Sequence, residues 1–171
     1  MSTEQERSAT RRPPPTHEPR RVLVVDDSGV QLRMMRAALE KSGFEVVDAE
    51  NGAEGLLRIA EQPFHLVLSD CQMPLMDGYQ LCRLVKDDPA TRNLPVILLT
   101  GEQNRLSRFW ARTCGADLFL TKGQGLSGLV EAAGRMALKA PSEPARPVQA
   151  KGKSEQGLDA IQRRLAQALE R

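Results

Sequence analysis

Short runs of aliphatic residues without polar alternation recur along the chain, and such runs indicate strands buried on both faces of a parallel sheet. The predicted strands are residues 22–25, 44–49, 65–69, 95–100 and 118–121. Segments with apolar residues at helical spacing separate or follow them, at 28–41, 53–61, 78–86, 106–114 and 125–138. Five βα units with right-handed crossovers predict an α/β fold with a doubly wound parallel sheet and helices on both faces.

Polar residues stand where four of these strands end. They are Asp26 and Asp27 after the first strand, Asp70 after the third, Thr100 at the end of the fourth and Lys122 after the fifth. In sheets of this kind the functional site lies beyond the carboxyl ends of the strands. We therefore expect these five side chains to meet at one edge of the sheet.

Clustered carboxylates repel one another unless a cation holds them. Mg²⁺ accepts a few carboxylate oxygens while keeping several waters, and sites of this kind commonly serve phosphate chemistry. Lys122 then supplies a cation and Thr100 a hydroxyl donor for phosphoryl oxygens. Asp70 stands alone at its strand end, so it is the candidate nucleophile for an aspartyl phosphate. Helix capping is an alternative reason for Asp27, and a turn is one for Asp70.

Four ordered stretches of the sequence carry a resemblance to a known family. They are residues 24–28 (VVDDS), 70–78 (DCQMPLMDG), 98–101 (LLTG) and 115–122 (GADLFLTK). With the spacing between them, the chain resembles the receiver domain of two-component response regulators, the family that includes the chemotaxis regulators, over about residues 22–138. The resemblance implies a flavodoxin-like strand order of 2-1-3-4-5.

The resemblance also implies the chemistry of the site. A sensor histidine kinase or phosphotransfer protein passes a phosphoryl group from a phosphohistidine to Asp70 with Mg²⁺. The metal ligands implied are Asp27, Asp70 and the backbone carbonyl of Gln72, with Asp26 in support. Such a protein is a signalling switch rather than an enzyme that turns over substrate.

Lys122 and Thr100 are implied to contact the phosphoryl group, and Phe119 is at the position of an aromatic that turns inward on phosphorylation. An ordinary core phenylalanine explains Phe119 equally well. The implied output is a downstream protein target bound on the surface of helix 106–114, strand 118–121 and helix 125–138.

One residue departs from the family's pattern, and another departs from the pattern of a rival class of protein. Gly123 follows Lys122 where the family usually has a proline in a cis bond, which leaves a phosphorylation-independent pseudo-receiver as the alternative function. A magnesium-dependent phosphatase usually needs a second acid two residues after its nucleophile, and Gln72 stands there instead.

Composition and charge exclude several other classes. The chain has 171 residues, 40% of them hydrophobic, with a net charge of +2. Residues 22–138 carry 12 basic against 15 acidic side chains, which does not favour a nucleic-acid partner. There is no apolar run of about 18 residues and no signal peptide, so we expect a cytoplasmic protein. Three cysteines, an odd number, are expected to be small buried side chains, and His65 is expected to lie at the surface.

The remaining segments predict the organisation of the chain. Residues 1–21 are expected to be a disordered arm, 22–138 the receiver domain, 139–157 a Pro- and Gly-containing linker, and 158–171 a short amphipathic helix. The last helix is a docking or dimerising element, the start of an output module, or a frayed end, and self-association stays open. Phe109 and Trp110 are adjacent on a predicted helix, so we expect one of them to be exposed.

Overall fold

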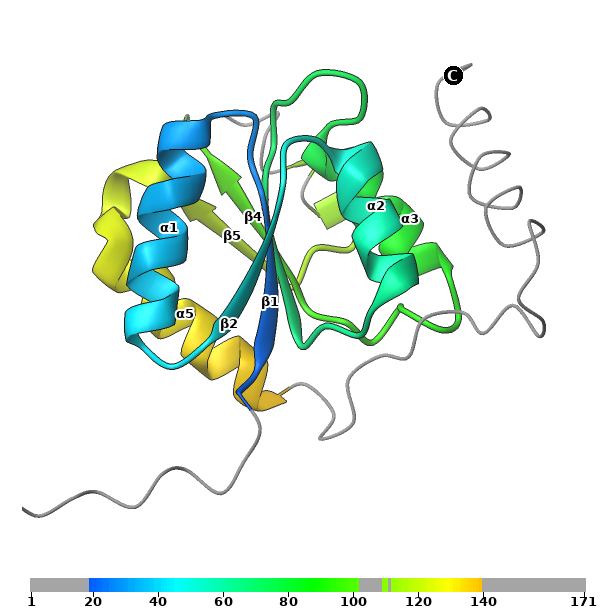
Figure 1. The fold of residues 1–171 in the computed structure, drawn as a ribbon. Coiled ribbons are helices and arrows are strands. Elements are labelled where there is room, and N and C mark those ends of the chain that lie inside the picture. Colours follow the sequence, from blue (N-terminus) through cyan, green and yellow to red (C-terminus); the bar gives the residue numbers. More distant parts are fainter. Residues whose placement is uncertain (1–18, 102–108, 111, 140–171) are drawn as a thin grey trace, which may run out of the picture.

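The computed structural model describes residues 19–101, 109–110 and 112–139 (Figure 1). The predicted linker beyond Lys139, the C-terminal helix, and all but the last residues of the predicted arm lie outside the described residues. The described strands and helices are β1 (Arg21–Val25), α1 (Gly29–Lys41), β2 (Glu45–Ala49), α2 (Gly52–Glu61), β3 (Leu66–Asp70), α3 (Gly78–Asp87), β4 (Val96–Thr100), β5 (Leu118–Thr121) and α5 (Gly125–Lys139). Between β4 and β5, residues 109–110 and 112–113 are helical.

The five strands form one parallel sheet in the order β2-β1-β3-β4-β5. Leu68 lies in register with Val24 on one side and with Ile97 on the other, so β3 is a central strand. The fold class and the strand order expected from the sequence are therefore confirmed.

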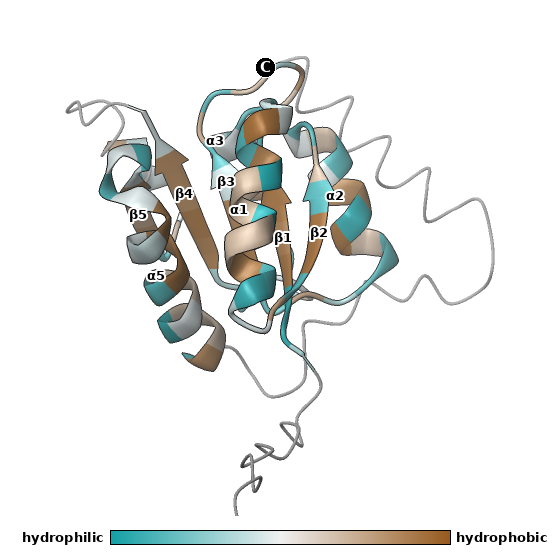
Figure 2. Ribbon diagram, turned by 60° about the vertical axis from the view of Figure 1, so that its left-hand side comes forward, coloured by the Kyte–Doolittle hydropathy of each residue, from teal (hydrophilic) through white to brown (hydrophobic). Residues whose placement is uncertain are grey.

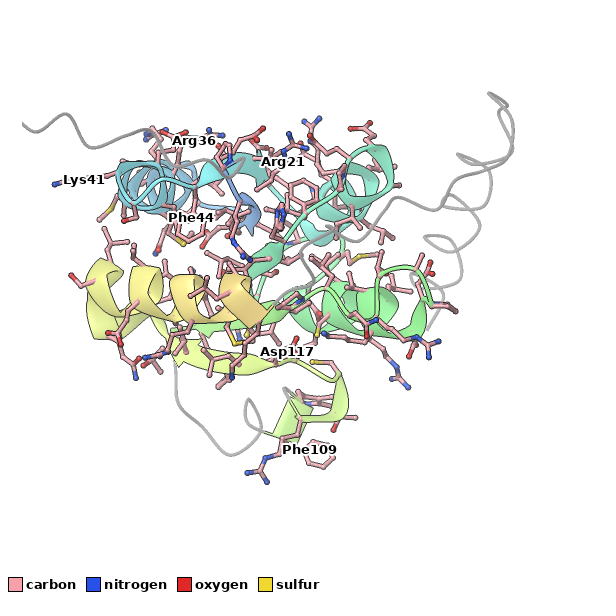
Figure 3. All side chains as sticks on the ribbon, turned by 90° about the horizontal axis from the view of Figure 1, so that it is seen from below. Arg21, Arg36, Lys41, Phe44, Phe109 and Asp117 are labelled. Carbon is pink, nitrogen blue, oxygen red and sulfur yellow. The ribbon has the colours of Figure 1, made fainter. Side chains whose placement is uncertain are left out.

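Two hydrophobic layers cover the sheet, one on each face (Figures 1 and 3). Leu32, Met35 and Leu39 of α1 and Leu129 of α5 pack on one face. On the other face, Ile59 of α2 and Leu81 and Val85 of α3 pack against residues such as Val25, Val67 and Leu98. Since both faces are covered, the strands are hydrophobic along their length, as Figure 2 shows for β1 and β4.

The helices begin where the sequence offers capping side chains. Ser28 accepts a hydrogen bond from the backbone N–H of Gln31 (3.4 Å), and Asn51 accepts one from Glu54 (2.9 Å). Asp77 forms a capping box with Gln80, in which each side chain accepts from the other's backbone N–H. These caps fix the positions at which the loops of the site pass into helices.

The structure moves several predicted boundaries by one residue. β1 begins at Arg21, inside the predicted arm, and α5 runs to Lys139. β3 includes Asp70, which pairs with Leu99, so the parallel ladder continues through the acidic residue. A 3₁₀ turn at Lys122–Gln124 was not predicted.

Among the described residues no helix is long and apolar enough to cross a membrane.

Candidate functional site

Three carboxylates converge at the carboxyl end of the sheet. Carboxylate oxygens of Asp26, Asp27 and Asp70 all lie within 4.8 Å of one another. Asp26 follows β1 and Asp70 ends β3, and these two strands are neighbours. Asp26 is fully buried and Asp70 is 7% exposed, whereas Asp27 is exposed. The sequence prediction that these acids meet at one edge of the sheet agrees with this geometry.

Lys122 joins this cluster from the turn after β5. Its Nζ lies 2.9 Å from Asp26 Oδ2 and 3.1 Å from Asp70 Oδ2. Burial disfavours the charged lysine, but the bonds to Asp26 and Asp70 outweigh it, so the pKa of Lys122 is raised. Burial also raises the pKa of Asp70, and the hydrogen bond from Lys122 offsets this only in part.

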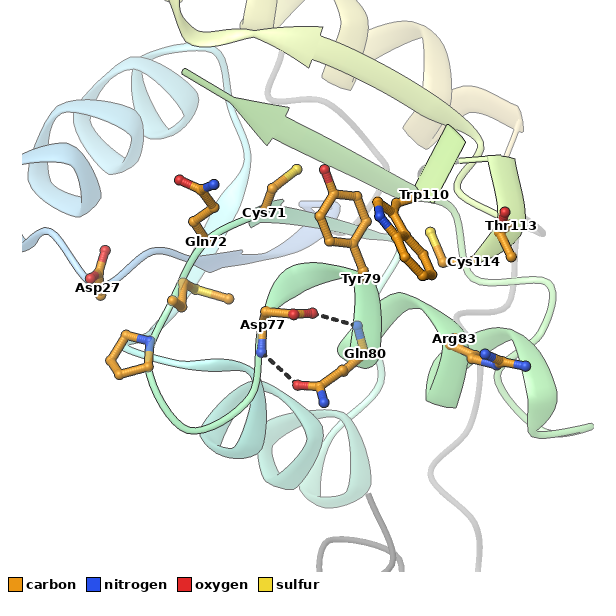
Figure 4. A pocket seen from close by; sticks show the side chains of 12 residues that line it. Asp27, Cys71, Gln72, Asp77, Tyr79, Gln80, Arg83, Trp110, Thr113 and Cys114 are labelled. Atoms are coloured by element: carbon orange, nitrogen blue, oxygen red, sulfur yellow. Dashed lines mark hydrogen bonds between the residues drawn. The ribbon is translucent and has the colours of Figure 1, made fainter. Parts of the chain in front are cut away.

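The two adjacent acids have different environments. Asp26 is held by its backbone N–H, which donates to Ala49 (3.1 Å), and by its Oδ1, which accepts from the N–H of Ser28 (2.9 Å). Asp27 points toward solvent at the mouth of the site (Figure 4). The sequence did not indicate which of the two would bond Lys122, because that depends on how deeply each is packed.

The donor set fits a hard divalent cation. Three carboxylates and one ammonium leave two formal negative charges, and the side-chain ligand atoms of the cluster are carboxylate oxygens. Mg²⁺ prefers such oxygens and binds through one or two carboxylates together with waters. The exposed Asp27 leaves one side of the cluster open to solvent, as a partly hydrated ion needs.

The loop between β3 and α3 is held by close backbone contacts. The Met76 side chain is 1% exposed, and its carbonyl accepts from the N–H of Gly52 (3.0 Å). A Cβ on Gly52 would lie 2.7 Å from that carbonyl oxygen, and a Cβ on Gly78 would collide with the Asp70 carbonyl oxygen. Leu75 adopts φ 68°, a left-handed conformation unusual for leucine. The motif at residues 70–78 thus fixes the loop as well as supplying Asp70.

The other predicted site residues lie around this cluster. Thr100 is buried at the end of β4, in register with Thr121. Phe119 is half-buried and packs against the core on the side of α2 and α3. Gln72 is exposed in the loop after Asp70 (Figure 4). The described residues contain no cis peptide bond, so the Lys122–Gly123 bond is trans.

The cysteines and the aromatic pair complete the surroundings. Cys71, Cys82 and Cys114 are buried and free, as expected, and burial raises the pKa of Cys71 to about 12.

Phe109 and Trp110 are 60% and 49% exposed, so both are exposed rather than one. Their rings meet edge to face, with centroids 5.6 Å apart, so each ring covers part of the other at the surface.

The chain thus combines a doubly wound parallel sheet with an acidic cluster and a lysine at the carboxyl edge of that sheet. Residues 22–134 match the response regulator receiver domain, so the chain belongs to that family. Residues 22–134 accordingly carry a receiver domain, with Asp26, Asp27, Asp70 and Lys122 gathered at the carboxyl end of its sheet.

Known relatives agree with this assignment. The chain is 41% identical over 102 residues to response regulator PleD of Caulobacter vibrioides, covering 60% of this chain but 22% of PleD. It is 36% identical over 102 residues to protein PilH of Pseudomonas aeruginosa, covering 60% of this chain and 84% of PilH. Among solved structures it resembles the receiver domain of a histidine kinase from Syntrophus aciditrophicus, with a TM-score of 0.67 and 31% identity over 78% of this chain and 96% of that one.

Proposed function

We propose that Asp70 is the residue that accepts the phosphoryl group. The observation that carries the proposal is the position of its carboxylate at the end of β3, close to both Asp26 and Asp27 and 3.1 Å from the ammonium of Lys122. A carboxylate at this place can act as a nucleophile toward phosphorus. The phosphoryl group of the resulting aspartyl phosphate would lie beside the Lys122 ammonium.

Mg²⁺ would be held by Asp27, Asp70 and the backbone carbonyl of Gln72, with Asp26 in support. When bound, it neutralises charge that develops on the phosphoryl oxygens. Asp26 also positions Lys122, whose Nζ it contacts at 2.9 Å. Thr100, which is buried at the end of β4, would donate its hydroxyl to a phosphoryl oxygen.

The donor in this proposal is a phosphohistidine of a sensor histidine kinase or phosphotransfer protein. A carboxylate oxygen of Asp70 attacks phosphorus, a new P–O bond forms and the P–N bond to the imidazole breaks. The electron pair of that bond returns to the imidazole nitrogen, which takes up a proton. Lys122 then pairs with the phosphoryl group on Asp70, and its bond to the Asp70 carboxylate is replaced.

The output in this proposal is a change of surface around β5. Movement of Thr100 toward the phosphoryl group frees space for Phe119, which is half-buried, to rotate inward. The surface near β5 and α5, with the exposed Trp110, would then bind a downstream protein target. The three free cysteines support a cytoplasmic location.

The test is labelling with acetyl phosphate and Mg²⁺, followed by mass spectrometry of the intact chain and of its peptides. We expect one phosphoryl group on Asp70, none on Asp70→Asn, and normal labelling of Asp87→Asn, a control at an exposed acid on α3. Label on Asp70→Asn would contradict the assignment. A folded wild-type chain that takes no label would favour a phosphorylation-independent interaction module.

The metal ligands need a separate measurement. Asp27→Ala is expected to weaken Mg²⁺ binding in a calorimetric titration, because it removes one of the direct carboxylate ligands. Asp87→Asn again serves as the control. Unchanged affinity in Asp27→Ala would remove Asp27 from the ligand set without affecting the assignment of Asp70.

A further inference from the structure

A groove of about 710 Å³ opens beside the acidic cluster, between α3 and the helical residues 109–110 and 112–113 (Figure 4). Its apolar lining comes from Cys71, Met73, Pro74, Tyr79, Trp110 and Cys114. Asp27 and Gln72 lie at one end, and Arg83 and Thr113 at the other (Figure 4). We call it the Trp110 groove. The roles proposed for phosphoryl transfer do not use its apolar lining, of which only Trp110 also belongs to the proposed target surface.

The lining has the character of a surface that binds an apolar partner. Trp110 is 49% exposed, although tryptophan is costly to leave in water. Exposed aromatic side chains in an apolar hollow commonly mark interaction sites. The volume falls within the range of small binding pockets, about 300–1,000 Å³, and is suited to a few side chains. A short helix that inserts one row of aliphatic residues fits this shape.

The chain itself carries such a segment after α5. Leu158, Ile161, Leu165 and Leu169 repeat at helical spacing and would share one face of a helix. Two heptads are too few to hold a coiled coil, so this face needs another partner. We propose that residues 158–171 dock intramolecularly into the Trp110 groove through this row of aliphatic side chains.

The connection permits this docking. α5 ends at Lys139, and residues 140–157 join it to the segment. A chain of that length spans about 60 Å when extended and about 24 Å on average as a flexible coil. Those lengths let the segment reach either face of a domain of this size. Tethering gives an effective concentration on the order of 1 mM, so even a weak site is occupied.

Charge is compatible with the same pairing. Arg164 and Arg171 flank one side of the aliphatic row and Asp159 and Glu170 the other. The groove likewise carries both signs, with Asp27 and Asp77 against Arg83. Asp27 lies at the end of the groove next to Gln72, and Asp77 lies nearer its middle, beside Gln80 (Figure 4).

Trp110 is the sole tryptophan in the sequence, so its fluorescence reports on the groove directly. In the full-length chain, Leu165→Asp is expected to shift Trp110 emission to the red and to increase quenching by acrylamide. Gln167→Asp adds the same charge on the opposite face and is expected to leave both unchanged. A synthetic peptide of residues 158–171 added to the Leu165→Asp chain is expected to reverse the shift.

A groove variant separates direct docking from an indirect effect. Met73→Asp places a charge in the lining, and it is expected to give the same red shift, with no further shift when combined with Leu165→Asp. The proposal is overturned if Leu165→Asp and Ile161→Asp both leave Trp110 emission unchanged. It is overturned equally if the wild-type signal depends on protein concentration, which would assign the groove to a second copy of the chain.

Discussion

At the scale of single residues, the ammonium of Lys122 offsets part of the negative charge of the three carboxylates. It contacts both Asp26, which has no exposed surface, and Asp70, which is 7% exposed. A buried carboxylate that loses its partner keeps its desolvation cost without the compensating attraction. Lys122 therefore stabilises the fold as well as serving the proposed phosphoryl transfer.

Removing this partner has a measurable cost. In metal-free buffer, Lys122→Met is expected to lower the free energy of unfolding by about 3 kcal/mol, because Asp26 and Asp70 remain buried together. Asp26→Asn in the same chain is expected to recover part of that loss. Denaturant unfolding of the two single mutants and the double mutant measures the coupling. Additive effects would show that the contact between Lys122 and Asp26 contributes nothing to stability.

His65 is a second residue whose environment only the structure shows. The sequence suggested a surface histidine, but Nδ1 accepts a hydrogen bond from the backbone N–H of Arg21 (3.0 Å) and the side chain is partly buried. Burial lowers the pKa of His65, and the positive charge of Arg20 adds to the effect. Only the unprotonated Nδ1 can accept this hydrogen bond.

This environment predicts the sign of a pH dependence. Because the folded-state pKa of His65 is below its unfolded value of 6.5, its contribution is intact at higher pH and is lost as the pH falls below 6.5. His65→Gln keeps an acceptor that does not titrate, so the loss of stability between neutral and mildly acidic pH should be smaller in that variant. His17→Gln, at the other histidine, serves as the control. Parallel stability curves for His65→Gln and the wild type would contradict the prediction.

At the scale of elements, the β3–α3 loop sets the position of Asp70. Gly78 brings the first turn of α3 against the Asp70 carbonyl, and Met76 locks the loop onto the start of α2. The sequence marked residues 70–78 as a motif and as a turn. It could not show that the glycine is needed for close approach, because that contact depends on how α3 packs against β3.

Gly78→Ala tests this contact. The added Cβ meets the Asp70 backbone, so the loop must shift, and we expect a loss of stability of about 2–3 kcal/mol together with weaker Mg²⁺ binding. The matched control is Gly134→Ala within α5, where nothing lies within 4 Å of an added Cβ. There, alanine is expected to stabilise the chain by about 0.5–1 kcal/mol. Thermal unfolding and a calorimetric metal titration measure both effects, and equal behaviour of the two variants would contradict this account.

At the scale of the whole molecule, the features predictable from the sequence are those set by local pattern. Buried parallel strands contain continuous aliphatic runs, so the strands and the polar residues at their ends could be found from the sequence. The partners of Lys122, the depth of Asp26 and the Trp110 groove arise from the packing of elements distant in the sequence. The 3₁₀ turn at Lys122–Gln124 escaped prediction because a turn this short leaves no periodic pattern.

The extent of the folded unit is a prediction at this scale. The last buried side chain of α5 is Ala137, and α5 packs its buried face over the sheet beside α1 (Figure 1). A chain ending at Lys139 is therefore expected to stay folded and to accept a phosphoryl group on Asp70, with a midpoint lowered only by the lost docking of residues 158–171. A chain ending at Gly128 loses Leu129, Ala132, Ala133 and Ala137 from the core, and we expect it to be unfolded.

Circular dichroism and acetyl phosphate labelling of the two truncated chains distinguish the possibilities. If the chain ending at Lys139 melts earlier and loses its label, residues 140–171 belong to the folded unit rather than following it. If it stays folded and labels at least as fast as the full chain, residues 140–171 are not needed for the fold and do not assist the reaction. The second result is expected, because the last buried side chain of α5 is Ala137, before the point of truncation.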